Sequence, residues 1–75
     1  MFEQFKTMLV DELQVEEDKI TLSAKLANDL GINSIELAEL VMRCEETFDV
    51  DIEDDDIHKF TTVGDVVSYL EKLVS

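Results

Sequence analysis

Apolar residues recur at helical spacing in three stretches of the chain, and no stretch shows the alternation typical of a β-strand. The first stretch predicts a helix from Phe2 to Leu13, with Phe2, Phe5, Leu9 and Leu13 on one face. The second predicts a helix from Ser34 to Phe48. The third predicts a helix that opens with Thr61-Thr62-Val63-Gly64-Asp65. The pattern therefore indicates an all-α bundle without a sheet.

The last helix has a predicted start signal and a predicted buried stripe. Thr62 and Asp65 have the spacing of a capping box. Between the second and last helices, the segment from Asp54 to Phe60 is long enough for a short helix, whose acidic start suits the positive end of a helix dipole. Ile57 and Phe60 are expected to face inward. The fold class is thus a four-helix bundle with three main helices and one short one. The stripe of the last helix comprises Val63, Val66, Val67, Leu70, Leu73 and Val74.

A long connection, from about Glu16 to Asn33, precedes the second helix. Loops of this length in a compact domain are either functional or packed down by their own apolar residues. Gly31 near its end is expected to adopt a positive φ. The residues expected to hold the connection to the bundle are Ile20, Leu22, Leu26 and Leu30.

The second helix has two apolar faces. The core face comprises Leu37, Val41, Cys44 and Phe48, with Leu40 beside it. Ile35 and Met42 fall on the opposite side together with Glu39 and Glu46, while Glu36 and Glu45 lie on the flanks. Either another element covers this second face, or the face is a docking surface. The interleaving of acids with the apolar pair favours docking of a basic partner.

Composition narrows the function. Seventy-five residues make a single domain, 1–75, with a modest core and little room for a deep catalytic cleft. Nineteen acidic residues against six basic ones give a net charge of −13, which disfavours nucleic acid and anionic membranes. A hydrophobic content of 45% argues against a disordered acidic tail. We expect a carrier or binding module and not an enzyme.

The expected compartment is the cytoplasm and the expected state is a monomer. One cysteine, Cys44, allows no internal disulfide. The segment from Met1 to Val10 lacks the features of a secretory signal, and no apolar run is long enough to span a membrane.

Ser34 is the main candidate for chemistry. One interpretation makes it the N-cap of the second helix. The other makes it the site of a phosphate ester, which would lie beside unpaired backbone N–H groups, with Gly31 keeping the approach uncrowded. Nucleophilic catalysis is disfavoured because it needs a base, and nothing in the sequence brings the only histidine, His58, to Ser34. His58 is expected at the surface.

Two metal-site hypotheses are weak. The acidic run from Asp49 to Asp56 lacks the EF-hand pattern, because its sixth and twelfth positions hold Asp54 and Phe60. It is either a weak divalent-cation site or a solvated acidic face. One Cys and one His make no zinc set. Cys44, on the core face, is expected to be a buried small hydrophobe.

The region around Ser34 resembles the Asp-Ser-Leu signature of acyl carrier proteins. The matching segment is Asp29-Leu30-Gly31-Ile32-Asn33-Ser34-Ile35-Glu36. The resemblance runs from about Ile20 to the end of the chain, with a compatible first helix. It includes Glu39-Leu40-Val41-Met42, Glu45-Glu46-Thr47-Phe48, Ile52 and the segment from Phe60 to Asp65. Asn33 stands where the family usually has Asp, and Ile35 where it usually has Leu, which bears on which transferase and pathway the protein serves.

The resemblance implies that Ser34 carries a 4′-phosphopantetheine arm, attached from coenzyme A by a phosphopantetheinyl transferase. The arm's thiol would hold acyl groups as thioesters for enzymes of fatty-acid or related lipid and polyketide synthesis, and the helical interior would shelter the chain. The partners implied are acyl-processing synthases and transferases with basic docking patches. The docking residues implied are Ile35, Glu36, Glu39, Met42, Glu45, Glu46 and Asp54.

Two alternatives remain from the sequence. One is a carrier for aminoacyl or polyketide cargo. The strong acidity of the chain counts against an aminoacyl carrier. The other is a non-covalent acidic helical adaptor in which Ser34 serves only as a cap.

Overall fold

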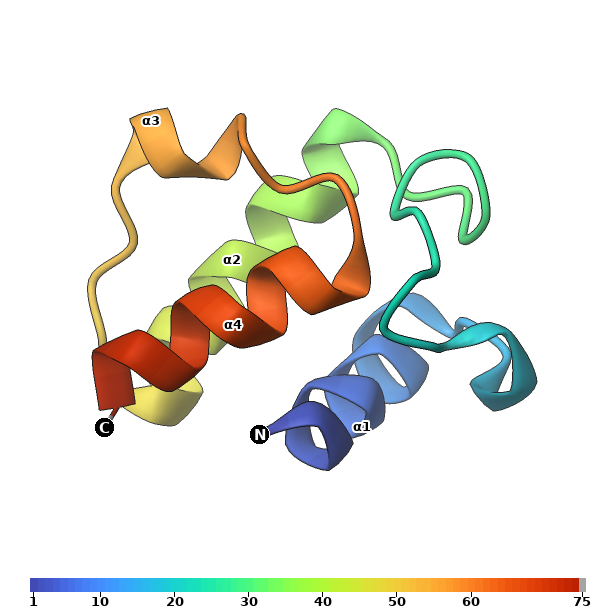
Figure 1. The fold of residues 1–75 in the computed structure, drawn as a ribbon, viewed down its shortest axis with the longest axis horizontal. Helices are drawn as coiled ribbons and strands as arrows, with labels where there is room; N and C mark the ends of the chain where they lie inside the picture. The colour runs from blue at the N-terminus through green and yellow to red at the C-terminus, as the bar shows by residue number, and fades with distance from the viewer. Residues whose placement is uncertain (75) are drawn as a thin grey trace.

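The structure is a computed structural model that describes residues 1–74. It consists of α1 (Phe2–Leu13), the 3₁₀ turn η1 (Glu17–Lys19), α2 (Ser34–Phe48), α3 (Asp54–Ile57) and α4 (Val63–Val74). The long helix α1 contacts both α2 and α4, and the short α3 lies across the top of the bundle (Figure 1). Within the described residues the only β feature is an isolated bridge between Lys25 and Thr62. The all-α prediction is confirmed.

The apolar faces predicted from spacing form the core. The bounds of α1 and α2 agree with those expected from the sequence, whereas α3 has only four residues and ends at Ile57 instead of Phe60. The prediction was wrong for the end of α4: Leu73 and Val74 are 39% and 47% exposed, because the last turn of α4 extends past the buried cluster. The most deeply buried side chains are Phe5, Leu9, Leu40, Cys44, Val63 and Leu70.

The connection before α2 is held partly by side chains and partly by its backbone. Ile20 and Leu26 are buried and Leu30 is half-buried, as expected. The expectation for Leu22 was wrong, since its side chain is 52% exposed. Leu22 holds the connection instead through its carbonyl, which accepts a hydrogen bond of 2.8 Å from the N–H of Gly64. Backbone pairing here replaces apolar burial.

Two more backbone hydrogen bonds join this connection to the start of α4. The N–H of Leu26 donates to the carbonyl of Thr61, and the N–H of Val63 donates to the carbonyl of Ala24, both at 2.9 Å. Together with the bond from Gly64 to Leu22, they form what we call the loop clamp. It fixes the chain segment that leads into α2 against the segment that leads into α4.

The capping box predicted for α4 is confirmed. The N–H of Asp65 donates to Oγ1 of Thr62 at 3.2 Å, and the N–H of Thr62 donates back to Oδ2 of Asp65 at 3.1 Å. The N–H of Thr61 also donates to Oδ2 of Asp65, at 3.0 Å. These backbone donors stabilise the carboxylate and lower the pKa of Asp65 below its usual range.

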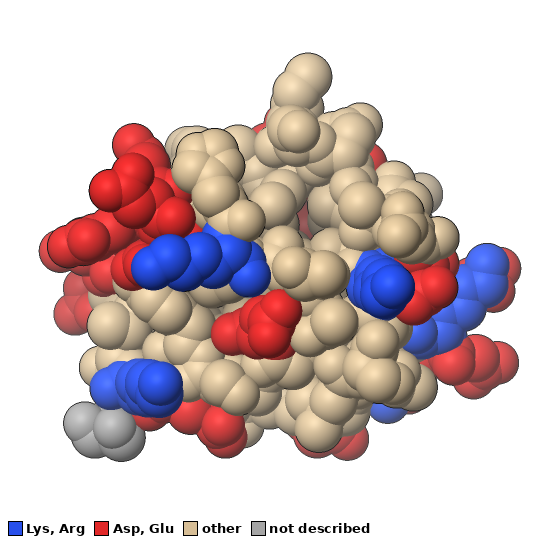
Figure 2. Space-filling view, turned by 45° about the horizontal axis from the view of Figure 1, so that its top comes forward, with Lys and Arg blue, Asp and Glu red and all other residues tan. Residues whose placement is uncertain are grey.

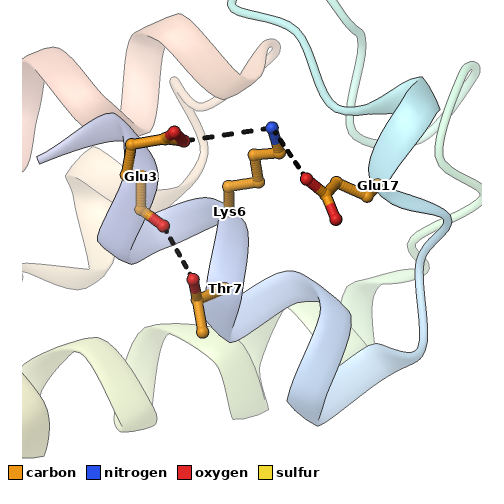
Figure 3. A network of polar contacts seen from close by, with 4 residues as sticks. All are labelled: Glu3, Lys6, Thr7 and Glu17. Carbon is orange, nitrogen blue, oxygen red and sulfur yellow. Dashed lines mark hydrogen bonds and ion pairs between the residues drawn. The ribbon is translucent and has the colours of Figure 1, made fainter.

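Polar contacts of α1 reach η1. The ammonium of Lys6 lies 3.4 Å from Oε1 of Glu17 and 3.9 Å from Oε2 of Glu3, and Oγ1 of Thr7 donates to the carbonyl of Glu3 at 3.0 Å (Figure 3). Lys6 therefore links α1 to the first turn of the connection. Such exposed pairs contribute little stability individually.

Within residues 1–74, no helix has the length and hydropathy needed to cross a bilayer.

Cys44 is buried on the core face of α2, as expected. Its Sγ lies 3.9 Å from Sδ of Met8 on α1. Burial, with a smaller contribution from the charge of Glu45, raises the pKa of the Cys44 thiol to about 12. The thiol is therefore protonated and shielded in the folded protein.

We expect Cys44 to resist alkylation in the folded protein. With a pKa of about 12, only about one thiol in ten thousand is ionised at pH 8, and the thiolate is the nucleophile. Iodoacetamide labelling followed by intact mass should be slow without denaturant and complete in denaturing urea. Native labelling as fast as that of free cysteine would contradict the buried position.

Gly64 should not tolerate a side chain. A Cβ at this position would lie 2.9 Å from the carbonyl oxygen of Leu22, a backbone atom of the loop clamp. Gly64→Ala should therefore lower the free energy of unfolding by roughly 1–3 kcal/mol in spite of alanine's better helix propensity. Urea denaturation measures this, with Ser68→Ala on the exposed side of α4 as the matched control. Equal stability of the two variants would show that the clamp relaxes freely.

Candidate functional site

Asn33 caps α2, so the interpretation of Ser34 as the N-cap was wrong. Asn33 is extended (φ −87°, ψ 177°), and its Oδ1 accepts the N–H of Glu36 at 2.8 Å. Oε1 of Glu36 in turn accepts the N–H of Asn33 at 3.2 Å, which completes a capping box. Asparagine is as good a cap as serine, and it comes one residue earlier. Ser34 is therefore the first residue of the helix.

The hydroxyl of Ser34 is left exposed. It makes no hydrogen bond with any residue that the structure describes, and no described acceptor takes the N–H groups of Ser34 or Ile35. Those two donors belong to the first turn, at the positive end of α2. An exposed hydroxyl beside two free backbone donors fits a phosphate ester, the linkage through which 4′-phosphopantetheine is attached.

Gly31 and Ile32 bring Ser34 to this position. Gly31 has φ of +69°, as predicted, and open space surrounds the place where a Cβ would lie. Its N–H donates to the carbonyl of Ala27 at 3.2 Å, closing the turn before the helix. Ile32 is then buried, and its N–H donates to the carbonyl of Leu26 at 2.9 Å. The chain is anchored two residues before Ser34, which stays in solvent.

Two grooves meet at Ser34. Both are lined by Ser34, Leu37 and Phe60. The α3-side groove has a volume of about 500 Å³ and is completed by Ala38, Asp54, Ile57 and His58. The loop-side groove has a volume of about 230 Å³ and adds residues of the connection, notably Lys25 and Asn28. Ser34 thus has a larger groove toward α3 and a smaller one toward the connection.

Contacts from α4 hold the wall of the α3-side groove. The hydroxyl of Tyr69 donates to Oδ2 of Asp56 at 2.7 Å, and the rings of Phe60 and Tyr69 meet edge-to-face at 5.3 Å. The hydrogen bond from Tyr69, assisted by Lys59, lowers the pKa of Asp56. Ile57 and Phe60 are half-buried, which agrees with their predicted inward direction. The segment from Asp56 to Phe60 is therefore tied to α4.

His58 is exposed, as expected, yet it lines the same groove as Ser34. The sequence did not indicate this proximity. No hydrogen bond joins the two side chains in the described structure, so Ser34 lacks the contacting base that a nucleophilic serine needs.

The second face of α2 is exposed. Ile35 is 73% exposed and Met42 is 59% exposed, so the alternative in which another element of this chain covers them is wrong. Glu39 and Glu46 on the same face are also exposed. We call these four residues the α2 stripe. Figure 2 shows the densest group of acidic side chains at the upper left of its view, and a separate acidic patch near the centre with cations on either side.

The other acids predicted for docking differ in their surroundings. Glu36 belongs to the capping box described above. Glu45 is half-buried, and its Oε2 accepts the N–H of Ile52 at 2.9 Å, which ties the end of α2 to the next segment. Asp54 is exposed at the start of α3 and has no ionic partner within residues 1–74. Two of these acids thus serve the fold, whereas Asp54 is free.

Arg43 is a charged residue of this surface that the sequence reasoning missed. Its Nε lies 3.3 Å from Oε1 of Glu12 on α1, and its Nη1 lies 3.8 Å from Oε2 of Glu46. The spacing of Arg43 and Glu46 signals a pair on one helix, but the contact to Glu12 depends on the packing of α1 on α2. Arg43 partly neutralises Glu46 and leaves Glu39 as the unpaired acid of the stripe.

The acidic run from Asp49 to Asp56 shows no sign of a metal site. Within residues 1–74, no three His, Cys, Asp or Glu side chains are grouped so that they would hold a metal ion. Most acids of this run are exposed, which agrees with a solvated acidic face; they are Asp49, Asp51, Glu53, Asp54 and Asp55.

Comparison with known proteins identifies the family. Residues 3–70 match the family described as "Phosphopantetheine attachment site". The chain is 45% identical to an acyl carrier protein of Akkermansia muciniphila over 71 residues, which cover 95% of this chain and 89% of that protein. It is 44% identical to an acyl carrier protein of Thermotoga maritima, covering 96% and 89%. It is 42% identical to one of Campylobacter lari, covering 97% and 95%. The chain therefore belongs to the acyl carrier protein family, whose members are carriers with a covalently attached 4′-phosphopantetheine and not enzymes.

Proposed function

We propose that Ser34 is the attachment point of the 4′-phosphopantetheine arm and that the protein, as one carrier domain, delivers thioester-bound acyl groups to enzymes of fatty-acid or related lipid and polyketide synthesis. The observation that supports the site most strongly is the exposed, unbonded hydroxyl of Ser34 at the first position of α2. When attached, the arm supplies the thiol that holds the acyl group. Family membership supports the carrier role independently of this geometry.

The surroundings of Ser34 indicate which groups this chain supplies for the attachment reaction and which the transferase must supply. The N–H groups of Ser34 and Ile35 are placed to bind phosphate oxygens. Among residues 1–74, no basic group contacts the Ser34 hydroxyl. The transferase must therefore take the serine proton as the Ser34 oxygen bonds to the pantetheine-side phosphorus of coenzyme A, while the P–O bond of the diphosphate breaks and adenosine 3′,5′-bisphosphate leaves.

The α3-side groove supports the expectation that the acyl chain is sheltered. Leu37, Ala38, Ile57 and Phe60 provide an apolar lining directly beside Ser34. Apolar burial favours a hydrocarbon chain in such a groove over water. Asp54 and His58 leave the rim polar.

The α2 stripe supports docking of basic partners, which the proposal takes to be the phosphopantetheinyl transferase and acyl-processing synthases and transferases. Apolar Ile35 and Met42 lie next to acidic side chains, so that a partner can add apolar contact to charge attraction. The proposal also has the protein working as a monomer in the cytoplasm, which accords with a single buried thiol.

The attachment site is tested by mass spectrometry. Incubation with coenzyme A and a broad-specificity phosphopantetheinyl transferase should add one phosphopantetheine mass to the protein, and Ser34→Ala should abolish the gain. Ser68→Ala, at another exposed serine, is the matched control and should be modified normally. Absence of any gain, or a gain that survives Ser34→Ala, would support the non-covalent adaptor instead.

Docking is tested by single charge neutralisations. Glu39→Gln should slow association with the transferase by about two- to threefold at low salt, and Glu46→Gln should slow it less, because Arg43 already pairs with Glu46. Stopped-flow association rates at low and high salt measure both effects. Glu71→Gln on α4 makes the same charge change outside the stripe. If all three variants associated at one rate, the stripe would have no special role in docking.

A further inference from the structure

The loop-side groove differs in chemistry from the α3-side groove. Beyond the residues that the two grooves share, its lining has apolar Leu26, Ala27 and Ile32 together with polar Lys25, Asn28, Asn33 and Thr61. The α3-side groove instead adds apolar Ala38 and Ile57 to a polar rim. The two grooves therefore differ chiefly in charge, because the loop-side groove has the cation Lys25 and the α3-side groove has the carboxylate of Asp54.

Lys25 differs from most other cations of this chain in its lack of an ionic partner among the described residues. Lys6, Lys19, Arg43 and Lys59 each lie within 4 Å of a carboxylate, whereas the ammonium of Lys25 has no ionic partner in the part of the chain that is described. The net charge of the protein is −13, so carboxylates are abundant. Lys25 lines the groove that contains Ser34, so its unpaired ammonium is available for an anion attached there.

The backbone of Lys25 is held firmly while its side chain is exposed. Its N–H donates to Oδ2 of Asp29 at 2.8 Å, and its carbonyl accepts the N–H groups of Asp29 and Leu30 at 2.9 and 3.1 Å. The residues on either side, Ala24 and Leu26, both take part in the loop clamp. The base of the side chain therefore has a fixed position relative to the groove.

We propose that Lys25 is a positioning residue that binds the phosphodiester of the arm on Ser34 and draws the arm into the loop-side groove. This inference rests on the proposed function, since it requires the arm at Ser34. The diester keeps one negative charge at the mouth of the groove, where a lysine ammonium offers three donors. Asn28 and Thr61 supply polar partners for the amide groups of the arm. The α3-side groove is then left to the acyl chain.

The contact is weak and salt-sensitive. Lys25 is exposed, and exposed ion pairs contribute little. We expect Lys25→Gln to lower the ratio of groove-bound to free arm by roughly two- to fivefold. A weak contact suits a carrier, because the arm must leave the groove when a partner enzyme takes the thioester.

Nuclear magnetic resonance on the apo and holo proteins tests the proposal. The holo form is prepared with coenzyme A whose pantetheine amides are labelled with ¹⁵N, and its loading is checked by intact mass. In the wild type, conversion from apo to holo should move the amide signals of Lys25, Asn28 and Thr61. Lys25→Gln should change the ³¹P shift of the diester and increase the mobility of the arm amides. High salt should move the wild type toward the variant.

Two further variants sharpen the test. Lys25→Arg keeps the charge and should behave like the wild type. Lys19→Gln removes an equal charge at a residue that lines neither groove, and should leave the ³¹P shift and arm mobility unchanged. Identical ³¹P shifts and arm mobility in the wild type and Lys25→Gln, or an equal response to Lys19→Gln, would overturn the role of Lys25. A protein that gains no mass at Ser34 would overturn the proposed function itself, and the inference with it.

Discussion

The loop clamp is the constraint on which the rest of the structure depends. Its three backbone hydrogen bonds, of 2.8 to 2.9 Å, join Leu22, Ala24 and Leu26 to the segment that opens α4. Without them the long connection would have only a few buried side chains to hold it, and its ordering would cost conformational entropy with little return. The clamp fixes one wall of the loop-side groove. It also places Phe60, which both grooves share, close to the start of α2.

The sequence predicted those elements whose signals lie within a short stretch of neighbouring residues. Spacing alone predicted the bounds of α1 and α2, and the Thr62–Asp65 capping box was readable because all its atoms lie within four residues. The N-cap of α2 was misassigned by one residue, to Ser34 instead of Asn33, for a local reason as well. Asparagine and serine are both good caps, and only the extended backbone at Asn33 shows which of them is used.

Features that depend on distant segments were not predictable in the same way. Leu22 resembles a buried anchor in the sequence, but its contribution is a carbonyl that meets Gly64. Arg43 reaches Glu12 only because α1 packs on α2. The proximity of His58 to Ser34 follows from the way Tyr69 ties the segment around α3 to α4. Hydropathy patterns contain no information about such pairings, since they depend on tertiary geometry.

Several acids of this chain serve the fold, and this helps to explain why its high negative charge is tolerated. Glu36, Glu45 and Asp65 accept backbone N–H groups, so their charges satisfy donors that would otherwise be unpaired. Glu39 and Asp54 accept no backbone donor within residues 1–74, and Glu39 adds to the repulsion among the acids of the folded state. In the docking that we propose, Glu39 on α2 and Asp54 beside the α3-side groove are the acids that attract a basic partner.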